Sequence, residues 1–123
     1  MSSGPKTYVF NRTRQAYLAT ELSLADTHWS RFCGLMLKNA SYFPKGRGLW
    51  IVPSRGVHTF AMRFPIDVVY LDKNQRVVHL AQGLKPWRMA AVKLEAASVL
   101  ELPGDTLAAS GTKIGDELEI VGL

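Results

Sequence analysis

Short apolar runs separated by turn residues constrain the fold of this 123-residue chain more than any other feature. Runs that read as β-strands occur at Gly48–Val52, Val57–Met62, Ile66–Leu71, Arg76–Leu80, Ser98–Leu102 and Glu117–Val121. Between them stand turn-forming residues such as Asp72–Gln75, Pro103-Gly104 and Gly115-Asp116. Gly, Pro, Asn and Asp favour turns because their side chains permit or fix the backbone angles that turns need. The pattern therefore predicts a mainly β domain.

The first third of the chain predicts a β-hairpin followed by a helix. Thr7–Phe10 and Gln15–Leu22 are strand-like on either side of the turn Asn11–Arg14. After Asp26, a candidate N-cap, apolar residues recur at helical spacing, namely Trp29, Phe32, Cys33 and Met36. We therefore expect a helix over Thr27–Leu37, with Gly34 allowing close packing on the sheet. The whole pattern predicts a compact, jelly-roll-like β-sandwich or a partly open β-barrel with one main α-helix packed on it.

Length and composition indicate one globular domain over residues 1–123. With 47% hydrophobic and 20% charged residues, the chain is typical of ordinary globular proteins. A single cysteine allows no internal disulfide, which favours a reducing compartment. The N-terminus lacks the apolar stretch of a signal peptide, and the longest apolar runs are too short to cross a bilayer. We expect a cytoplasmic protein without membrane contact.

The net charge of +5 is unevenly distributed along the chain. Residues 27–66 contain six basic residues and no acidic one, whereas residues 95–123 contain six acidic residues and only Lys113 as a base. Either the two blocks pair with each other, or the basic block forms a surface that attracts anions. The basic residues stand singly and match no nucleic-acid motif, so we expect no nucleic-acid partner.

The segment from His58 to Asp72 places polar groups inside runs that otherwise read as buried strand. In an extended chain His58, Phe60, Met62 and Phe64 share one face, which should point inward because three of the four are large and apolar. His58 is then either bonded to a backbone carbonyl beside Met62 or lies at the mouth of an apolar pocket. Asp67 either caps the preceding turn, pairs with a cation such as Arg31, or serves a site.

Trp87 is a large aromatic residue in Lys85–Glu95, a segment that we predict to be a loop. It either packs over one end of the sandwich or forms the wall of a binding groove.

The sequence lacks the motifs that usually mark a catalytic nucleophile, a metal site or a phosphate-binding site. Cys33 lies on the apolar stripe of the expected helix, where a free cysteine behaves as a small hydrophobic residue. His28, His58 and His79 are isolated, so no metal-ligand spacing is present. The chain also has neither a phosphate-binding Gly-rich loop nor a nucleophile elbow. We expect no metal and no organic cofactor.

Ordered motifs over most of the chain resemble a known family. They are Arg31-x-x-Gly-Leu-Met, His58-x-Phe-x-Met-x-Phe-Pro-Ile-Asp-Val-Val-Tyr-Leu-Asp, Val77-Val, Val99-Leu-Glu-Leu and Gly115-Asp. From about Tyr17 to Val121 the chain resembles the bacterial and archaeal family called domain of unknown function 192. The resemblance implies a compact β-rich domain with one helix, and it brings no established reaction, substrate or cofactor.

Two hypotheses about function follow. The first is a non-catalytic module that binds a small anion, a peptide end or a glycan. Its pocket would be lined by His58, Met62, Asp67 and Trp50 or Trp87, and edged by Arg31 or Arg63. The second is a small enzyme in which His58 acts as general acid or base and Asp67 orients it. Binding is favoured because the sequence offers no nucleophile, metal site or second acid.

Overall fold

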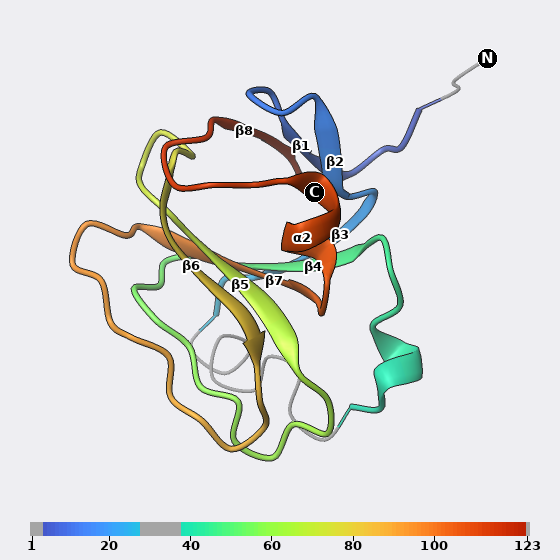
Figure 1. The fold of residues 1–123 in the computed structure, drawn as a ribbon, viewed down its shortest axis with the longest axis vertical. Coiled ribbons are helices and arrows are strands. Elements are labelled where there is room, and N and C mark those ends of the chain that lie inside the picture. Colours follow the sequence, from blue (N-terminus) through green and yellow to red (C-terminus); the bar gives the residue numbers. More distant parts are fainter. Residues whose placement is uncertain (1–3, 28–37, 123) are drawn as a thin grey trace.

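The computed structural model describes residues 4–27 and 38–122 and shows two β-sheets packed against each other (Figure 1). The smaller sheet has the order β2-β1-β8 and consists of β1 (Tyr8–Asn11), β2 (Ala16–Ala19) and β8 (Leu118–Val121). The larger sheet has the order β3-β4-β7-β5-β6 and consists of β3 (Glu21–Ala25), β4 (Arg47–Ile51), β5 (Ile66–Leu71), β6 (Val77–Leu84) and β7 (Ser98–Pro103). The prediction of a mainly β, sandwich-like domain is confirmed, and neither sheet closes into a barrel.

Both predicted hairpins are present. β1 and β2 pair antiparallel around Asn11–Arg14, and β5 and β6 pair antiparallel around Asp72–Gln75. In the second turn, Asp72 Oδ1 accepts hydrogen bonds from the backbone N–H groups of Asn74 and Arg76 at 2.8 and 3.0 Å. Only the β3–β4 pair among the described strands is parallel.

The predicted strand Gln15–Leu22 is divided between the two sheets. The chain turns at Thr20, whose N–H donates to the carbonyl of Gly46, so β2 lies in the smaller sheet and β3 in the larger one. Gly48 makes this crossing possible, because a Cβ atom there would lie 3.0 Å from the Ala19 Cβ atom. A longer side chain at position 48 would push the two sheets apart.

The helix expected over Thr27–Leu37 lies outside the described residues apart from Thr27, and so do Gly34, Met36 and Cys33. The described helices are the 3₁₀ helix η1 (Ala40–Tyr42) and α2 (Thr106–Ser110), neither of which is predicted from the sequence. A helix of five residues is too short to produce an apolar period of 3.6. Within residues 4–27 and 38–122, no helix is long and apolar enough to cross a membrane.

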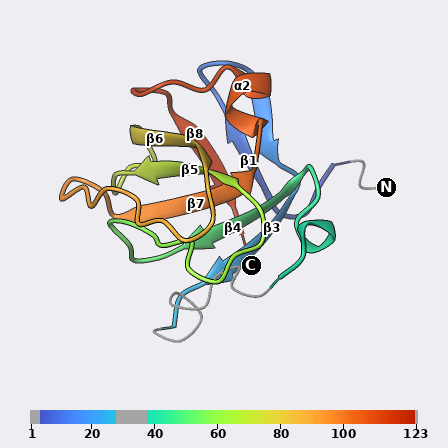
Figure 2. The same ribbon diagram turned by 60° about the horizontal axis from the view of Figure 1, so that its bottom comes forward.

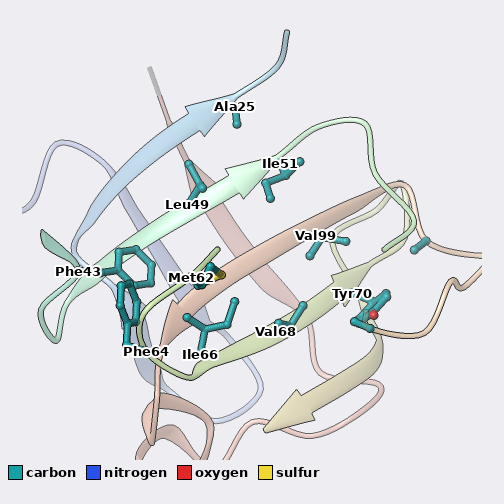
Figure 3. Close-up of a cluster of buried hydrophobic side chains, with 12 residues drawn as sticks. Ala25, Phe43, Leu49, Ile51, Met62, Phe64, Ile66, Val68, Tyr70 and Val99 are labelled. Carbon is teal, nitrogen blue, oxygen red and sulfur yellow. The ribbon is translucent and has the colours of Figure 1, made fainter. Parts of the chain in front are cut away.

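Two hydrophobic clusters cover the two faces of the larger sheet. The inner cluster lies between the sheets and includes Val9, Leu18, Val69, Leu100, Leu107 and Leu118. The outer cluster lies on the opposite face, where Phe43, Met62 and Phe64 pack over residues of β4, β5 and β7 (Figure 3). Figure 2 shows the strand order of the larger sheet, and α2 contacts β2 of the smaller sheet. Because both faces are covered, all six residues of β5 are buried.

Candidate functional site

Two irregular segments, residues 54–62 and 85–93, run side by side over the outer face of the larger sheet. The Thr59 N–H donates to the Arg88 carbonyl at 2.7 Å, and the Trp87 N–H donates to the Thr59 carbonyl at 2.8 Å. His58 and Met89 form an isolated β-bridge. The prediction of a regular strand over Val57–Met62 is therefore wrong, whereas the prediction of an irregular segment over Lys85–Glu95 is confirmed.

Thr59 anchors the two segments to each other. Its side chain is fully buried, and its hydroxyl donates to the Lys85 carbonyl at 2.6 Å while accepting from the Arg88 N–H at 2.8 Å. Two non-glycine residues in these segments, Ala61 and Trp87, have positive φ angles of 60° and 62°. Such angles are uncommon for residues with a Cβ atom and persist only where the surroundings hold them.

These segments present a row of three rings. The His58 imidazole stacks on Phe60 with 5.2 Å between ring centroids, and Phe60 lies 6.3 Å from Trp87 with the rings inclined by 31°. The Phe60 N–H donates to His58 Nδ1 at 3.2 Å, which orients the imidazole. Trp87 is 63% exposed and Phe60 is 40% exposed. The structure thus brings together His58 and Trp87, two residues singled out from the sequence, and adds Phe60.

The two segments that carry the aromatic row, and the residues next to them, are predominantly basic. Residues 54–64 and 85–95 carry Arg55, Arg63, Lys85, Arg88 and Lys93 against the single acid Glu95. The four ion pairs found within residues 4–27 and 38–122 lie elsewhere and involve Arg12, Arg14, Arg47 and Arg76. Within the described residues, no ion pair joins the basic block of residues 27–66 to the acidic block of residues 95–123.

Met62 does not belong to the aromatic row. It is 3% exposed and packs with Phe64 in the outer cluster, while Phe60 points outward. The prediction that His58, Phe60, Met62 and Phe64 share one inward face is therefore wrong. The left-handed backbone at Ala61 breaks the alternation of an extended chain, so Thr59 and Met62 point inward instead.

Asp67 lies on the opposite face of the larger sheet, toward the inner cluster. It is 1% exposed, and its two oxygens accept from the backbone N–H groups of Gly83 at 2.9 Å and Leu107 at 2.8 Å. These bonds fasten the end of β6 and the first turn of α2 to β5. The structure therefore does not bring Asp67 together with His58 and Met62. Arg31, the expected cationic partner of Asp67, lies outside the described residues.

Trp50 also faces away from the aromatic row. It packs against the inner cluster, and its indole N–H donates to the Ser98 hydroxyl at 2.9 Å. Of the two tryptophans considered from the sequence, only Trp87 lies beside His58.

Glu101, a buried acid on β7, is not among the residues singled out from the sequence. It is 2% exposed, and its Oε1 atom accepts no hydrogen bond from any described residue. Because β7 alternates, Glu101 shares the outer face with Val99, between Leu49 of β4 and Val68 of β5. Burial raises the pKa of Glu101 to about 8, so the carboxyl group is largely protonated at neutral pH. An unpaired buried polar atom costs about 1–3 kcal/mol, which makes this residue a candidate for a functional role.

Fold and site together define a small β-sandwich domain with an exposed aromatic row on cationic loops and a buried acid in the larger sheet. The chain belongs to the DUF192 family, whose model, described as "Uncharacterized ACR", matches residues 9–120. The predicted family membership is thus confirmed.

Relatives and solved structures agree with this membership. A UPF0127 protein of Pyrococcus furiosus is 33% identical over 116 residues, which cover 90% of this chain and 96% of that protein. A UPF0127 protein of Thermococcus sibiricus is 32% identical over 90% of this chain and 73% of its own length. A crystal structure of a protein of unknown function from Novosphingobium aromaticivorans aligns with a TM-score of 0.78, 21% identity, and coverage of 92% of this chain and 82% of that chain. That likeness shows the fold alone.

Proposed function

We propose that this protein is a non-catalytic binding module that takes a small anionic ligand on the aromatic row of His58, Phe60 and Trp87. The observation that carries this proposal is the row itself, three successive rings of which Phe60 and Trp87 are exposed to solvent. Exposed rings attract the flat faces of other ring systems and of sugars, because stacking removes apolar surface from water. The bonds of Thr59 hold the row in place before any ligand arrives, so little conformational entropy is lost on binding.

The charge around the row favours an anionic ligand. Arg88 follows Trp87 directly, and Lys85 precedes it by two residues. Neither side chain has a carboxylate within 4 Å among the described residues. A ligand with a ring or sugar face and one phosphate or carboxylate group matches both features, since arginine binds such groups through paired N–H donors.

The enzyme hypothesis has no comparable support. It requires Asp67 to orient His58, but each Asp67 oxygen already accepts a backbone N–H on the inner face of the sheet. Losing either bond would leave a buried N–H group unpaired. We therefore propose binding alone.

The experiment is a thermal-shift screen with nucleoside monophosphates and sugar phosphates, followed by calorimetric titration of the compounds that stabilise the protein. We expect AMP to bind more tightly than adenosine, its neutral counterpart, and Trp87→Ala to weaken AMP binding at least tenfold. Ile114→Ala is the matched control, because Ile114 is also 63% exposed but lies before β8. The proposal fails if no phosphate compound binds or if Trp87→Ala binds AMP like the parent. Binding of peptides or neutral glycans at the row instead would change the ligand class.

A further inference from the structure

The segment over residues 85–95 turns small side chains inward and large apolar side chains outward. Ala90 and Ala96 are buried in the outer cluster, where they help to cover the larger sheet. The apolar strip, which consists of Met89, Val92 and Leu94, is instead 70%, 64% and 79% exposed. A segment that served only as a cover would gain stability by burying these larger side chains, because their burial removes more apolar surface from water.

The apolar strip adjoins the aromatic row. Met89 faces His58 across an isolated antiparallel β-bridge, and the side chains of such a pair lie on the same face. Val92 lies against the neighbouring segment, where a Cβ atom at Gly56 would be 3.4 Å from Val92 Cγ2. Figure 1 shows the segment that carries the strip as an orange loop along the margin of the molecule. Exposed apolar side chains that lie together in this way mark an interaction surface.

The charges next to the strip show what kind of surface it fits. The Lys93 N–H donates to the Arg55 carbonyl at 2.9 Å, so these two basic residues occupy neighbouring positions on the two segments. Arg63, Lys85 and Arg88 add further positive charge, against the single acid Glu95. A second copy of the chain docked on the same surface would bring like charges together, which disfavours a symmetric dimer here. An anionic surface would instead be attracted.

We propose that the apolar strip docks the protein on the surface of an anionic lipid bilayer. Met89, Val92 and Leu94 enter the boundary between headgroups and acyl chains, and the basic residues beside them contact lipid phosphates. Lysine and arginine suit this position because their alkyl stems lie along apolar surface while their charges stay in the headgroup layer. Trp87 fits the same surface, since tryptophan is enriched at membrane interfaces. The sequence expectation of no membrane contact depends on the lack of a spanning run, and a peripheral contact needs none.

The layout of the strip favours a bilayer over an acidic protein. Its three side chains are spread along one segment, and each is mostly exposed. A fluid lipid interface accommodates such a row without matching its shape, whereas a protein partner has to pack closely around its main contact residues. Failure on vesicles would leave an acidic protein as the partner of this surface.

The experiment is co-sedimentation of the intact chain with lipid vesicles at pH 7. The anionic vesicles contain phosphatidylcholine and phosphatidylglycerol at about 2:1, and the neutral vesicles contain phosphatidylcholine alone. We expect at least tenfold tighter binding to the anionic vesicles, because each basic residue near the surface contributes about fivefold. Raising the salt concentration from about 0.1 M to about 0.5 M should weaken this binding, since salt screens the charges.

Two variants separate the apolar contribution from the electrostatic one, after thermal unfolding has shown that each is folded. The serine variant, Met89→Ser/Val92→Ser/Leu94→Ser, keeps all the charges and should weaken binding to anionic vesicles about tenfold or more, because the inserted apolar area is lost. The glutamine variant, Arg55→Gln/Lys93→Gln, keeps the apolar strip and should weaken the same binding at least tenfold. It should also be less sensitive to salt than the parent.

The matched control is Lys113→Gln/Ile114→Ser, which removes one basic and one exposed apolar residue before β8 of the smaller sheet. This control should bind anionic vesicles like the parent. The inference is overturned if the parent does not bind anionic vesicles or binds both vesicle types equally. It is also overturned if the serine variant binds like the parent, or if the control loses as much affinity as the serine variant.

This inference goes beyond the proposed function, and the two can fail independently. The serine variant keeps the three rings of the aromatic row together with Lys85 and Arg88, so it should bind AMP like the parent. If the parent binds AMP but no vesicles, only the membrane contact is wrong. If it binds anionic vesicles but no AMP, the membrane contact stands and the proposed function is wrong.

Discussion

At the scale of single residues, two buried acids on neighbouring strands show how the face of a sheet decides the role of a side chain. Val68 of β5 pairs with Glu101 of β7, so Asp67 and Glu101 are one position apart in register and point to opposite faces. Asp67 accepts hydrogen bonds from two backbone N–H groups on the inner face, whereas Glu101 lies among apolar side chains on the outer face. The first acid fastens the fold, and the second keeps an oxygen atom without a hydrogen-bond partner among the described residues.

Glu101 should make the stability of the protein depend on pH. Burial raises its pKa to about 8 in the folded protein, above the ordinary value of 4.5 in the unfolded chain. Between these two values the folded state binds the extra proton, so its stability falls as pH rises, by up to about 1.4 kcal/mol per pH unit. The contribution is fully present below pH 4.5 and is lost as pH rises through 8. Urea unfolding of the parent between about pH 5 and pH 9 should show this slope, and Glu101→Gln should abolish it. An equal slope in both proteins would contradict the assignment.

Asp67 should contribute far more to the free energy of unfolding than a surface acid that accepts the same number of hydrogen bonds. Asp67→Ala leaves the N–H groups of Gly83 and Leu107 without an acceptor inside the fold, which should cost about 3 kcal/mol in the free energy of unfolding. Asp72 also accepts two backbone N–H groups, but in an exposed turn where water replaces it. Asp72→Ala should therefore cost about 1 kcal/mol or less. Equal losses in urea unfolding would show that the Asp67 bonds are not the cause.

At the scale of elements, the regular strands could be predicted and the irregular segments could not. Ile66–Leu71 is β5 with the predicted bounds, because Ile66, Val68, Val69 and Tyr70 favour strands and the turn residues Pro65 and Asp72 flank the run. Val57–Met62 has a similar composition but depends on Thr59, whose partners lie 26 to 29 residues further along the chain. No local pattern contains that information.

The candidate site could be predicted only in part, because some of its features depend on contacts between distant parts of the chain. His58 and Trp87 stand out in the sequence because an ionisable and a large aromatic residue occupy unusual positions, and they do lie on adjacent segments. Glu101 does not stand out, because a single polar residue between Leu100 and Leu102 fits a strand with one solvent-exposed face. Only the sheet order places β7 between β4 and β5, where both faces are covered.

Thr59 should control the aromatic row through its hydroxyl group. Thr59→Val preserves the shape of the side chain but leaves the Arg88 N–H and the Lys85 carbonyl without this partner. We expect a loss of about 2 kcal/mol in the free energy of unfolding, together with weaker AMP binding. Thr59→Ser keeps the hydroxyl and should retain more of both properties. If the valine variant is as stable as the serine variant, the hydroxyl does not hold the loops together.

At the scale of the whole molecule, the protein is a sandwich in which the larger sheet is buried on both faces. The smaller sheet and α2 cover the inner face, and loops cover the outer face (Figure 2). Loops that cover a rigid sheet tolerate unusual backbone angles and exposed side chains, which is where binding residues are commonly found. The two segments that carry the aromatic row cover this outer face.

The junction of the two sheets should depend on Gly48. A Cβ atom at this position would lie within 3.4 Å of side-chain atoms of Ala19 on β2, Leu22 on β3 and Leu102 on β7. Gly48→Val should therefore lower the free energy of unfolding by about 2 kcal/mol through overpacking. At Gly104 a Cβ atom would meet only the Pro65 carbonyl within 4 Å, at 3.8 Å, so Gly104→Val should cost clearly less. Similar melting temperatures for the two variants would contradict a close contact at Gly48.

The most direct test of the account is a heteronuclear NMR titration of the ¹⁵N-labelled protein with AMP, with adenosine as the neutral control. The account predicts that the largest shifts fall on the Trp87 indole N–H and on the backbone amides of Phe60 and Arg88, the segments that form the aromatic row. Adenosine should cause smaller shifts at the same signals. If AMP shifts no signal, or if its shifts map to residues far from Phe60 and Trp87, the aromatic row is not a binding site and the proposed function is wrong.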